Sequence, residues 1–229
     1  SKMNWGNTII SARWNYIFNN RLFSNTTVSY NNYLFDINAY TSNQYALGND
    51  ETFTNRYSSD YRSGINDWNY QIDFDYNPSP VHHVKFGAGY IYHRFRPEVM
   101  TSKISDRTDD QTYRDTTYHN MNNSRIYAHE VSAYAEDNLK ISSRLRLNLG
   151  LHFSLFHVQK QSYFSLQPRI SARYQLTDDI TLKASYTKMS QYVHLLSSMP
   201  IAMPTDLWVP VTKEIKPMQS HQYSLGGYY

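Results

Sequence analysis

Apolar and polar side chains alternate strictly along much of this chain, most clearly on either side of residues 177–179. The stretches 166–176 and 180–187 each place an apolar residue at every second position. Successive side chains of a strand point to opposite faces of a sheet. The pattern therefore predicts two antiparallel β-strands that are joined by a short polar turn.

The polar faces of these two strands carry three cations, Arg169, Arg173 and Lys183. Unpaired charge buried inside a small sandwich costs far more free energy than such a core can offset, so these faces must meet water. If the apolar faces meet a protein core, the strands belong to an ordinary antiparallel sheet. If they meet lipid, the strands form the wall of a transmembrane barrel.

The same two-faced pattern recurs in about nine places along the chain. Besides the pair above, the clearest alternating stretches are 8–16, 22–30, 68–76, 84–92, 131–135 and 145–155, with the opening of another at 223–229. A chain of this kind predicts an all-β fold made of successive antiparallel strands. The prediction is an antiparallel up-and-down β-sheet with one apolar face and one polar face.

The connections between these strands are sorted by length. Short turns near 19–21, 77–80, 141–144 and 177–179 alternate with connections at 36–64, 97–124, 158–164 and 189–220. Every second connection of an up-and-down sheet lies at the same end, so one rim is predicted to carry turns and the other long loops. That asymmetry is typical of outer-membrane barrels, although 158–164 departs from it by being short.

Composition is compatible with a membrane barrel and excludes a helical membrane protein. The chain has 229 residues and 22 tyrosines, and its mean hydropathy is −0.67. No segment approaches the roughly 18 consecutive apolar residues that a spanning helix needs. A barrel strand escapes this test, because its polar face cancels its apolar face in any averaged window.

Charge and chemistry exclude several other classes of protein. The net charge of +3 is small and scattered, which argues against a nucleic-acid partner, and cysteine is absent. The nine histidines lack metal-ligand spacing, and Gly87-Ala88-Gly89 lies in a predicted strand rather than before a helix. No nucleophile elbow or isolated carboxylate pair is present. We therefore expect no enzyme activity, no cofactor and no metal site.

The second half of the chain carries motifs that resemble a known family. They are Pro168-Arg169-Ile170-Ser171, Ala184-Ser185-Tyr186 with Gln191-Tyr192, the run from Pro204 to Pro210, Lys216-Pro217, and the run from Gln222 to Gly226. Together they resemble the β-barrel domain of TonB-dependent outer-membrane receptors of the Bacteroidetes type. The resemblance is specific from about residue 129 to 229.

The resemblance implies a location in the outer membrane of a Gram-negative bacterium and a role in nutrient uptake. Such receptors have a barrel of about 22 strands that is filled by a plug domain. They import metal chelates, cobalamin or oligosaccharides with energy supplied by TonB. The implied partners are outer-membrane lipid, the plug domain, the TonB complex and a small nutrient ligand. This chain has fewer strands and no recognisable plug, so residues 1–229 are interpreted as a single region, an incomplete part of the barrel.

Two groups of residues are candidates for substrate binding. The loop at about 190–220 contains Tyr192, His194, Asp206 and Trp208, and loops of this kind contact incoming ligands. The alternative is that prolines and Trp208 pack this loop onto the barrel rim. The cations Arg169, Arg173 and Lys183 are expected to face the lumen, where they can attract an anionic ligand, pair with acidic plug residues or stay solvated.

Two other functions remain open at this point. The first is a soluble or surface-attached, tyrosine-rich β domain that binds glycans. The second is a small self-contained porin. They differ from a receptor barrel in what covers the apolar face and in whether the sheet closes on itself.

Overall fold

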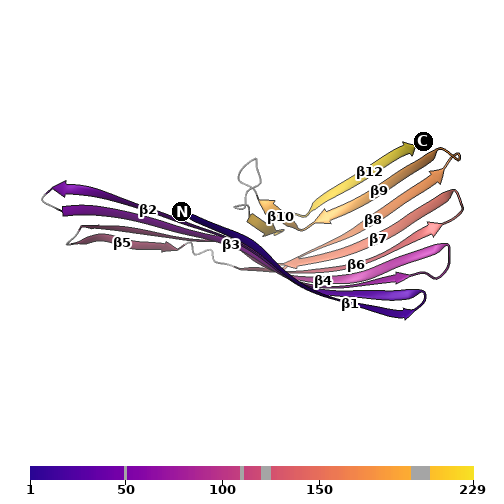
Figure 1. Cartoon of the computed structure of the whole chain (residues 1–229), viewed down its shortest axis with the longest axis horizontal. Coiled ribbons are helices and arrows are strands. Elements are labelled where there is room, and N and C mark those ends of the chain that lie inside the picture. Colours follow the sequence, from indigo (N-terminus) through magenta and orange to yellow (C-terminus); the bar gives the residue numbers. More distant parts are fainter. Residues whose placement is uncertain (49–50, 109–110, 120–124, 197–206) are drawn as a thin grey trace.

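The computed structural model describes residues 1–48, 51–108, 111–119, 125–196 and 207–229 (Figure 1). Within these ranges the chain consists of β-strands, turns and short irregular segments, and none of its segments is a helix long and apolar enough to cross a membrane. The strands are β1 (Lys2–Asn19), β2 (Leu22–Gly48), β3 (Glu51–Tyr76), β4 (His82–Thr108), β5 (Thr112–His119), β6 (Ile126–Lys140), β7 (Leu145–Val158), β8 (Gln161–Gln175), β9 (Thr181–Gln191), β10 (Val193–Leu196), β11 (Leu207–Pro210) and β12 (Met218–Tyr228).

Most of these strands form one antiparallel sheet in which neighbours in space are close in sequence. Its order is β1-β2-β3-β4-β6-β7-β8-β9-β12. Residues 82–95 of β4 pair with β6, and residues 101–107 of β4 pair with β5. The strands β10 and β11 form a separate two-stranded hairpin. The predicted up-and-down antiparallel fold is confirmed. Within the described residues β1 and β12 have one sheet neighbour each, so the sheet is open.

The register places the predicted apolar positions of all these strands on one face. Leu149 lies opposite Ile170, which lies opposite Tyr186, and Tyr186 lies opposite Tyr223. The side chains on this face are open to the surroundings, as Trp14 at 68% and Leu225 at 85% exposure illustrate. In the described part of the chain no second sheet or helix covers this face. A sheet with a continuous uncovered apolar face and a polar opposite face has the two sides of a membrane barrel wall.

The four predicted short turns lie at one end of the sheet, and side-chain oxygens close them. Asn19 Oδ1 accepts hydrogen bonds from the amides of Arg21 and Leu22 at 2.9 and 3.1 Å. Ser142 Oγ and Thr177 Oγ1 each accept from two backbone amides of their own turns in the same manner. Asn, Ser and Thr suit this position because their short side chains reach the backbone two or three residues ahead.

The predicted long loops at the other end are wrong in part, because two of them are extended strands. Residues 36–64 belong to β2 and β3, which pair from Leu22 opposite Tyr76 to Gly48 opposite Glu51. Residues 97–124 include the end of β4 and all of β5. These segments are rich in Ser, Thr, Asn and Tyr, and the outer part of β2 and most of β5 are exposed on both faces. Since neither face needs apolar residues there, the alternation that marks a strand is lost.

The extended strands reach far beyond a bilayer. β2 has 27 residues. At about 3.3 Å per residue such a strand is about 90 Å long, whereas the hydrocarbon core of a bilayer is about 30 Å thick. In Figure 1 the outer parts of β2, β3 and β5 form an arm on the left, away from the short turns on the right. The predicted exception at 158–164 is confirmed, because only Gln159 and Lys160 connect β7 to β8.

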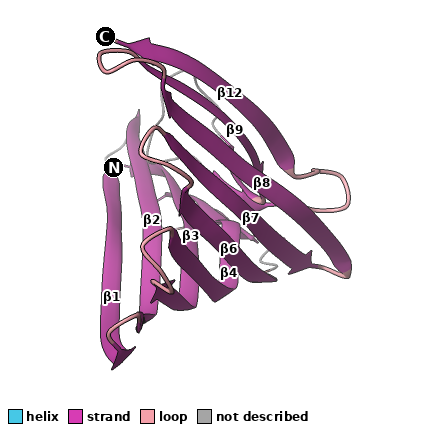
Figure 2. Cartoon of the chain, turned by 90° about the vertical axis from the view of Figure 1, so that its right-hand side faces the viewer, coloured by secondary structure: helices cyan, strands magenta, loops and turns pink. Residues whose placement is uncertain are grey.

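The sheet curls toward its polar face, as the end view shows (Figure 2). The β10–β11 hairpin lies on this concave side, where it contacts β3 and β4 (Figure 1). Beneath it is the core of buried apolar side chains in the described residues. Its members are Ile65, Phe95, Ala128, Phe156, Val158, Tyr192 and Val211. The concave face is therefore covered by protein at the outer end and open at the short-turn end.

Candidate functional site

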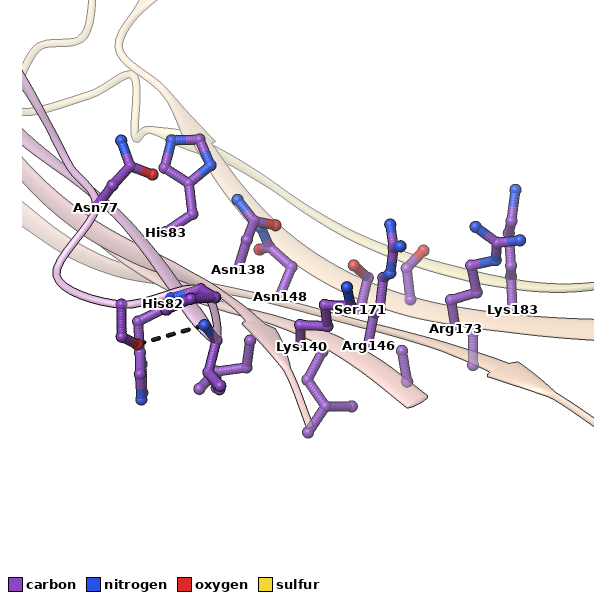
Figure 3. Close-up of a pocket in the computed structure, with 18 of the residues that line it drawn as sticks. Asn77, His82, His83, Asn138, Lys140, Arg146, Asn148, Ser171, Arg173 and Lys183 are labelled. Carbon is purple, nitrogen blue, oxygen red and sulfur yellow. Dashed lines mark hydrogen bonds between the residues drawn. The ribbon is translucent and has the colours of Figure 1, made fainter. Parts of the chain in front are cut away.

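A broad groove lies at the open, short-turn end of the concave face. It has a volume of about 1240 Å³ and extends from the β3–β4 turn to β12. The side chains that line its floor come from β6, β7, β8 and β9, and several of them are cationic (Figure 3). The curl of the sheet produces this groove, because it brings the turn at 77–81 and β12 to either side of one polar surface.

Four cations cross the floor of the groove in a row, one on each strand. In the register of the sheet Lys140 lies opposite Arg146, Arg146 opposite Arg173, and Arg173 opposite Lys183. We call these four residues the cation row. In Figure 3 the charged ends of Arg146, Arg173 and Lys183 project to the same side of the sheet. On the next strand Lys183 Nζ lies 4.3 Å from the centre of the Tyr228 ring.

The cation row has no acidic neighbour to balance it. All four side chains are exposed, and none forms an ion pair with another residue that the structure describes. Directly opposed like charges destabilise a sheet. Three directly opposed like-charged pairs in succession therefore cost stability, and that cost suggests a function.

Carboxylates on the same face lie outside the groove, on β3 and β6. Asp73 and Asp75 project from β3, and Glu136 projects from β6 beside Lys85. Both aspartates are engaged: Tyr134 Oη donates to Asp73 Oδ1 at 2.7 Å, and His83 Nε2 lies 2.9 Å from Asp75. The concave face thus carries its carboxylates on β3 and β6, whereas the groove is lined by the cation row. A complementary molecule would need the opposite arrangement.

The outer end of the concave face is held by Tyr192. Its side chain is 4% exposed and its ring stacks on Phe156 with centroids 5.1 Å apart. The hydroxyl is 2.7 Å from Ser154 Oγ, which also accepts a hydrogen bond from Gln167. Burial raises the pKa of the Tyr192 phenol, so this group stays neutral in its hydrogen bond. The backbone oxygen of Tyr192 accepts from the amide of Val211, which continues the β10–β11 pairing by one residue.

The structure thus divides the predicted site residues among different places. Arg173 and Lys183 meet in the cation row, and Arg169 is exposed on the same face of β8, opposite Thr187. Tyr192 is a core residue rather than an exposed loop residue. Trp208 lies opposite Leu195 in the β10–β11 hairpin and is partly exposed.

The other two predicted loop residues are His194 and Asp206. His194 is half-buried in the same hairpin, and both of its ring nitrogens are buried without a hydrogen-bond partner among the described residues. Asp206 lies outside the described residues, so its place in the site stays a prediction.

Sequence reasoning missed Lys140 and Arg146, although a signal for them exists. They flank the Ser142-Ser143 turn, and counting back from that turn pairs them across the hairpin. Sequence alone also does not show that their row continues through Arg173, because that requires the register of β7 against β8. In the described part of the chain no group of three or more potential ligands is placed to hold a metal ion.

The fold and its two faces define a class of protein. An antiparallel up-and-down sheet, apolar and uncovered on its convex side and polar on its concave side, with short turns at one end and long hairpins at the other, is a wall of an outer-membrane β-barrel. The family model for the TonB dependent receptor-like β-barrel matches residues 2–229, and the chain belongs to this family of outer-membrane transport receptors. The predicted location in the outer membrane is confirmed.

Solved structures resemble this chain at low sequence identity, and one of them shows the same fold. The ferric preacinetobactin receptor BauA from Acinetobacter baumannii is 11% identical, with a TM-score of 0.52 over 98% of this chain and 35% of that one. The ferric yersiniabactin uptake receptor FyuA from Yersinia pestis is 12% identical, with a TM-score of 0.46 over 97% of this chain and 43% of that one. This chain thus spans less than half the length of these receptors. No curated protein matches the sequence.

Proposed function

We propose that the chain forms part of the wall and outer rim of a receptor that takes up a scarce nutrient with energy supplied by TonB. The observation that carries the proposal is the pair of faces: an uncovered, mainly apolar face, on which Asp137 pairs with His82, and a concave polar face with a charged groove. The extended β2–β3 and β4–β5 hairpins support the proposal, since long segments outside the bilayer are where such barrels meet their ligands. In this proposal the chain has no catalytic role.

The proposed partners follow from the two faces. Outer-membrane lipid covers the apolar face, a plug domain fills the concave side, and the TonB complex acts through parts of the receptor other than this wall. We propose that residues 1–229 are a single barrel region of the Bacteroidetes type, in agreement with the motifs between Pro168 and Gly226. The ligand is a metal chelate, cobalamin or an oligosaccharide.

For ligand contact we retain Arg169, Trp208, His194 and Asp206 as candidates. Arg169 is exposed on the concave face, and Trp208 is partly exposed on the hairpin that covers its outer end. His194 is half-buried, and its two buried ring nitrogens have no hydrogen-bond partner among the described residues, so it can contact a ligand only if the hairpin moves. Tyr192 can contact a ligand only if the hairpin moves, because its side chain is buried.

The glycan-binding alternative requires a different environment for the apolar face. A soluble domain would have to cover residues such as Trp14, Leu166 and Leu225, which are 68%, 53% and 85% exposed. A self-contained porin would have to join β1 to β12, which do not pair in the described sheet. Both features favour a receptor wall over these two alternatives.

The test is deletion of the complete gene followed by uptake measurements. Cells lacking the gene should lose growth on one limiting nutrient from a panel of iron chelates, cobalamin and oligosaccharides, and a protonophore should have the same effect on wild-type cells. Fractionation should recover the protein in the outer membrane. Uptake that is insensitive to the protonophore, or a protein that is monomeric in buffer without detergent, would overturn the proposal.

A further inference from the structure

Four arginines gather on the convex side of the sheet, beyond the apolar positions of that face. Arg94 and Arg96 follow Tyr92 at alternate positions of β4, so the three side chains share a face. Arg62 lies on β3, two residues from the position opposite Arg96, and Arg125 directly precedes β6. We call Arg62, Arg94, Arg96 and Arg125 the arginine cluster.

The arginine cluster lies just past the length of strand that crosses a bilayer. On the convex face of β4 the apolar positions run from Val84 to Tyr92, with His82 before them and Arg94 after them. The eleven residues 83–93 between these two polar side chains match the roughly 9 to 11 residues with which a tilted strand spans the hydrocarbon. The short turns are at the His82 end of β4. The arginines therefore lie at the other interface, which is the outer one in the proposed receptor.

Aromatic side chains form a belt at the same level. Trp68 lies opposite Tyr92 and packs on Tyr30, with ring centroids 4.6 Å apart. Tyr127 lies opposite Arg94 and stacks on Tyr92, with centroids 6.2 Å apart. Trp and Tyr concentrate where a bilayer meets water, because each has an apolar ring and a polar group at its edge. The belt and the strand length thus indicate the same interface.

The described protein leaves most of the charge of the cluster unbalanced. Arg62 pairs with Asp36 at 3.1 Å. The other three arginines form no ion pair with any residue that the structure describes. Arg94 and Arg96 are half-buried, and the Nε atom of each is buried without a hydrogen-bond partner there. Burial, together with the charges of the other three arginines, lowers the pKa of Arg96. An anion that reached the cluster would relieve both the repulsion and the loss of hydration.

We propose that the arginine cluster binds the headgroup of an outer-leaflet lipid that bears more than one phosphate, as phosphorylated glycolipids do. The proposal rests on the proposed function, in which lipid covers the apolar face, and it adds a headgroup that the wall recognises. Guanidinium groups donate paired hydrogen bonds to the phosphate oxygens. The acyl chains of the same lipid lie along the apolar positions between Val84 and Tyr92.

The continuity of the cluster with the apolar face favours a lipid over a soluble anion or an acidic protein. Arg94 is two residues from Tyr92 on the same face, so the partner has to present negative charge directly beside hydrocarbon. The cluster also faces away from the concave side, and a nutrient inside the barrel would not reach it.

The type and the spacing of the cations favour several phosphates. All four are arginines, whose planar fork of donors fits a phosphate, whereas a lysine acts as a point charge. The cluster extends over β3, β4 and the start of β6, which is two strand spacings or about 10 Å. A single phosphate is too small to contact all of these side chains, so a headgroup with more than one fits better.

The experiment measures which lipids the whole receptor retains. The purified receptor is placed in phosphatidylcholine nanodiscs that contain a minor share of diphosphoryl lipid A, of the same glycolipid after enzymatic removal of its phosphates, or of phosphatidylglycerol. Native mass spectrometry then counts the lipids that remain bound when the receptor is released. We expect diphosphoryl lipid A to be retained at least about tenfold more than either of the other two lipids.

Three variants make the result specific. R94Q/R96Q/R125Q removes the three cations without an ion pair, so retention of diphosphoryl lipid A should fall by at least about tenfold. R94K/R96K/R125K keeps the charge without the paired donors, and its retention should lie between those of wild type and the glutamine variant. K140Q/R146Q/R173Q is the matched control, because it removes three cations from the concave side; it should retain lipid as wild type does. Circular dichroism of each variant checks that the strands are intact.

Several outcomes would overturn the proposal. Equal retention by wild type and the folded glutamine variant would show that the cluster does not bind lipid. Equal retention of the two glycolipids would reduce the contact to acyl chains, and equal retention of phosphatidylglycerol would show that one phosphate is sufficient. Displacement of the glycolipid by inorganic phosphate would show a site for a free anion. If deletion of the gene left uptake of every tested nutrient unchanged, the proposed function would be refuted, whereas the lipid measurement would stand.

Discussion

Replacing Leu149 with Arg tests which solvent meets the apolar face. Leu149 lies near the middle of β7, opposite Asp137 on one side and Ile170 on the other, and its side chain is 42% exposed. Nothing in the described protein covers it, so lipid is its expected neighbour. An arginine side chain at this position must either place its charge in hydrocarbon or extend along the barrel wall until the charge reaches the bilayer surface.

The expected cost of Leu149→Arg is about 2 to 4 kcal/mol, the value for a cation on the lipid face near the midplane of a bilayer. Asn148→Arg is the matched control, because Asn148 precedes Leu149 and faces the polar, concave side. It donates a hydrogen bond to Asn138 at 2.6 Å. Loss of this bond, which is open to water, costs about 1 kcal/mol or less. The losses in the free energy of unfolding of the two arginine variants should therefore differ by at least about 1 kcal/mol.

Guanidinium titrations of tryptophan fluorescence in phospholipid vesicles measure both free energies of unfolding. Leu149→Met belongs in the same series, because it conserves volume and apolarity and should cost less than about 1.5 kcal/mol. Equal losses for the two arginine variants would refute the assignment of faces. A Leu149→Arg variant as stable as wild type would refute it as well, since such a cation would have to be in water.

Three further substitutions test local features of the sheet. Gly87→Val should cost about 1 to 3 kcal/mol in the same titration, because a Cβ at Gly87 would lie 2.6 Å from the Ile72 oxygen and 2.8 Å from the Tyr134 ring; wild-type stability would contradict this. Lys160→Gly should stabilise the β7–β8 turn by up to about 1 kcal/mol, since Lys160 has a φ of 71°, and a loss of stability would contradict it. Tyr192→Phe should cost about 1 kcal/mol and increase proteolysis of the segment that follows β9; unchanged proteolysis would show that the hydroxyl does not hold the hairpin.

Alternation was sufficient to predict the sheet wherever one face meets an apolar environment. The stretches 145–155, 166–176 and 180–186 occur as β7, β8 and β9, or at their edges, with the predicted residues sharing a face. The short turns were also predictable, because their Asn, Ser and Thr side chains accept hydrogen bonds from the turn backbone. In these regions the residues that favour a strand or a turn locally are also the residues that suit the two faces and the end of the sheet.

Alternation failed to predict the outer parts of β2 and β3, where neither face of the sheet has to be apolar. Residues 39–48 and 51–60 pair along their whole length in β2 and β3, yet neither stretch has a face that must be apolar. Their strands are supported by neighbouring strands rather than by burial. The burial of Tyr192 was not predictable for a different reason, since it depends on Phe156 and Ser154, which are distant in sequence.

The candidate site was predicted in part, and the missing part depends on register. Arg173 and Lys183 were found because alternation places both on the polar faces of the two hairpin strands, and the structure pairs them. The same rule applies to Lys140 and Arg146. Joining the two pairs requires the pairing of Arg146 with Arg173, which the two-residue turn after β7 sets from the far end of the sheet. A change of one residue in that turn would move Arg146 to a different partner.

The two ends of the concave face are linked through β7 and β8. At the outer end, β10 and β11 have four residues each, and an isolated two-stranded hairpin is only marginally stable in water. Its order therefore depends on the contacts of Tyr192 with Phe156 and Ser154 on β7. The same two strands carry Arg146 and Arg173 at the other end. A substitution that weakens the pairing of β7 with β8 should therefore disturb both the alignment of Arg146 with Arg173 and the support beneath the hairpin.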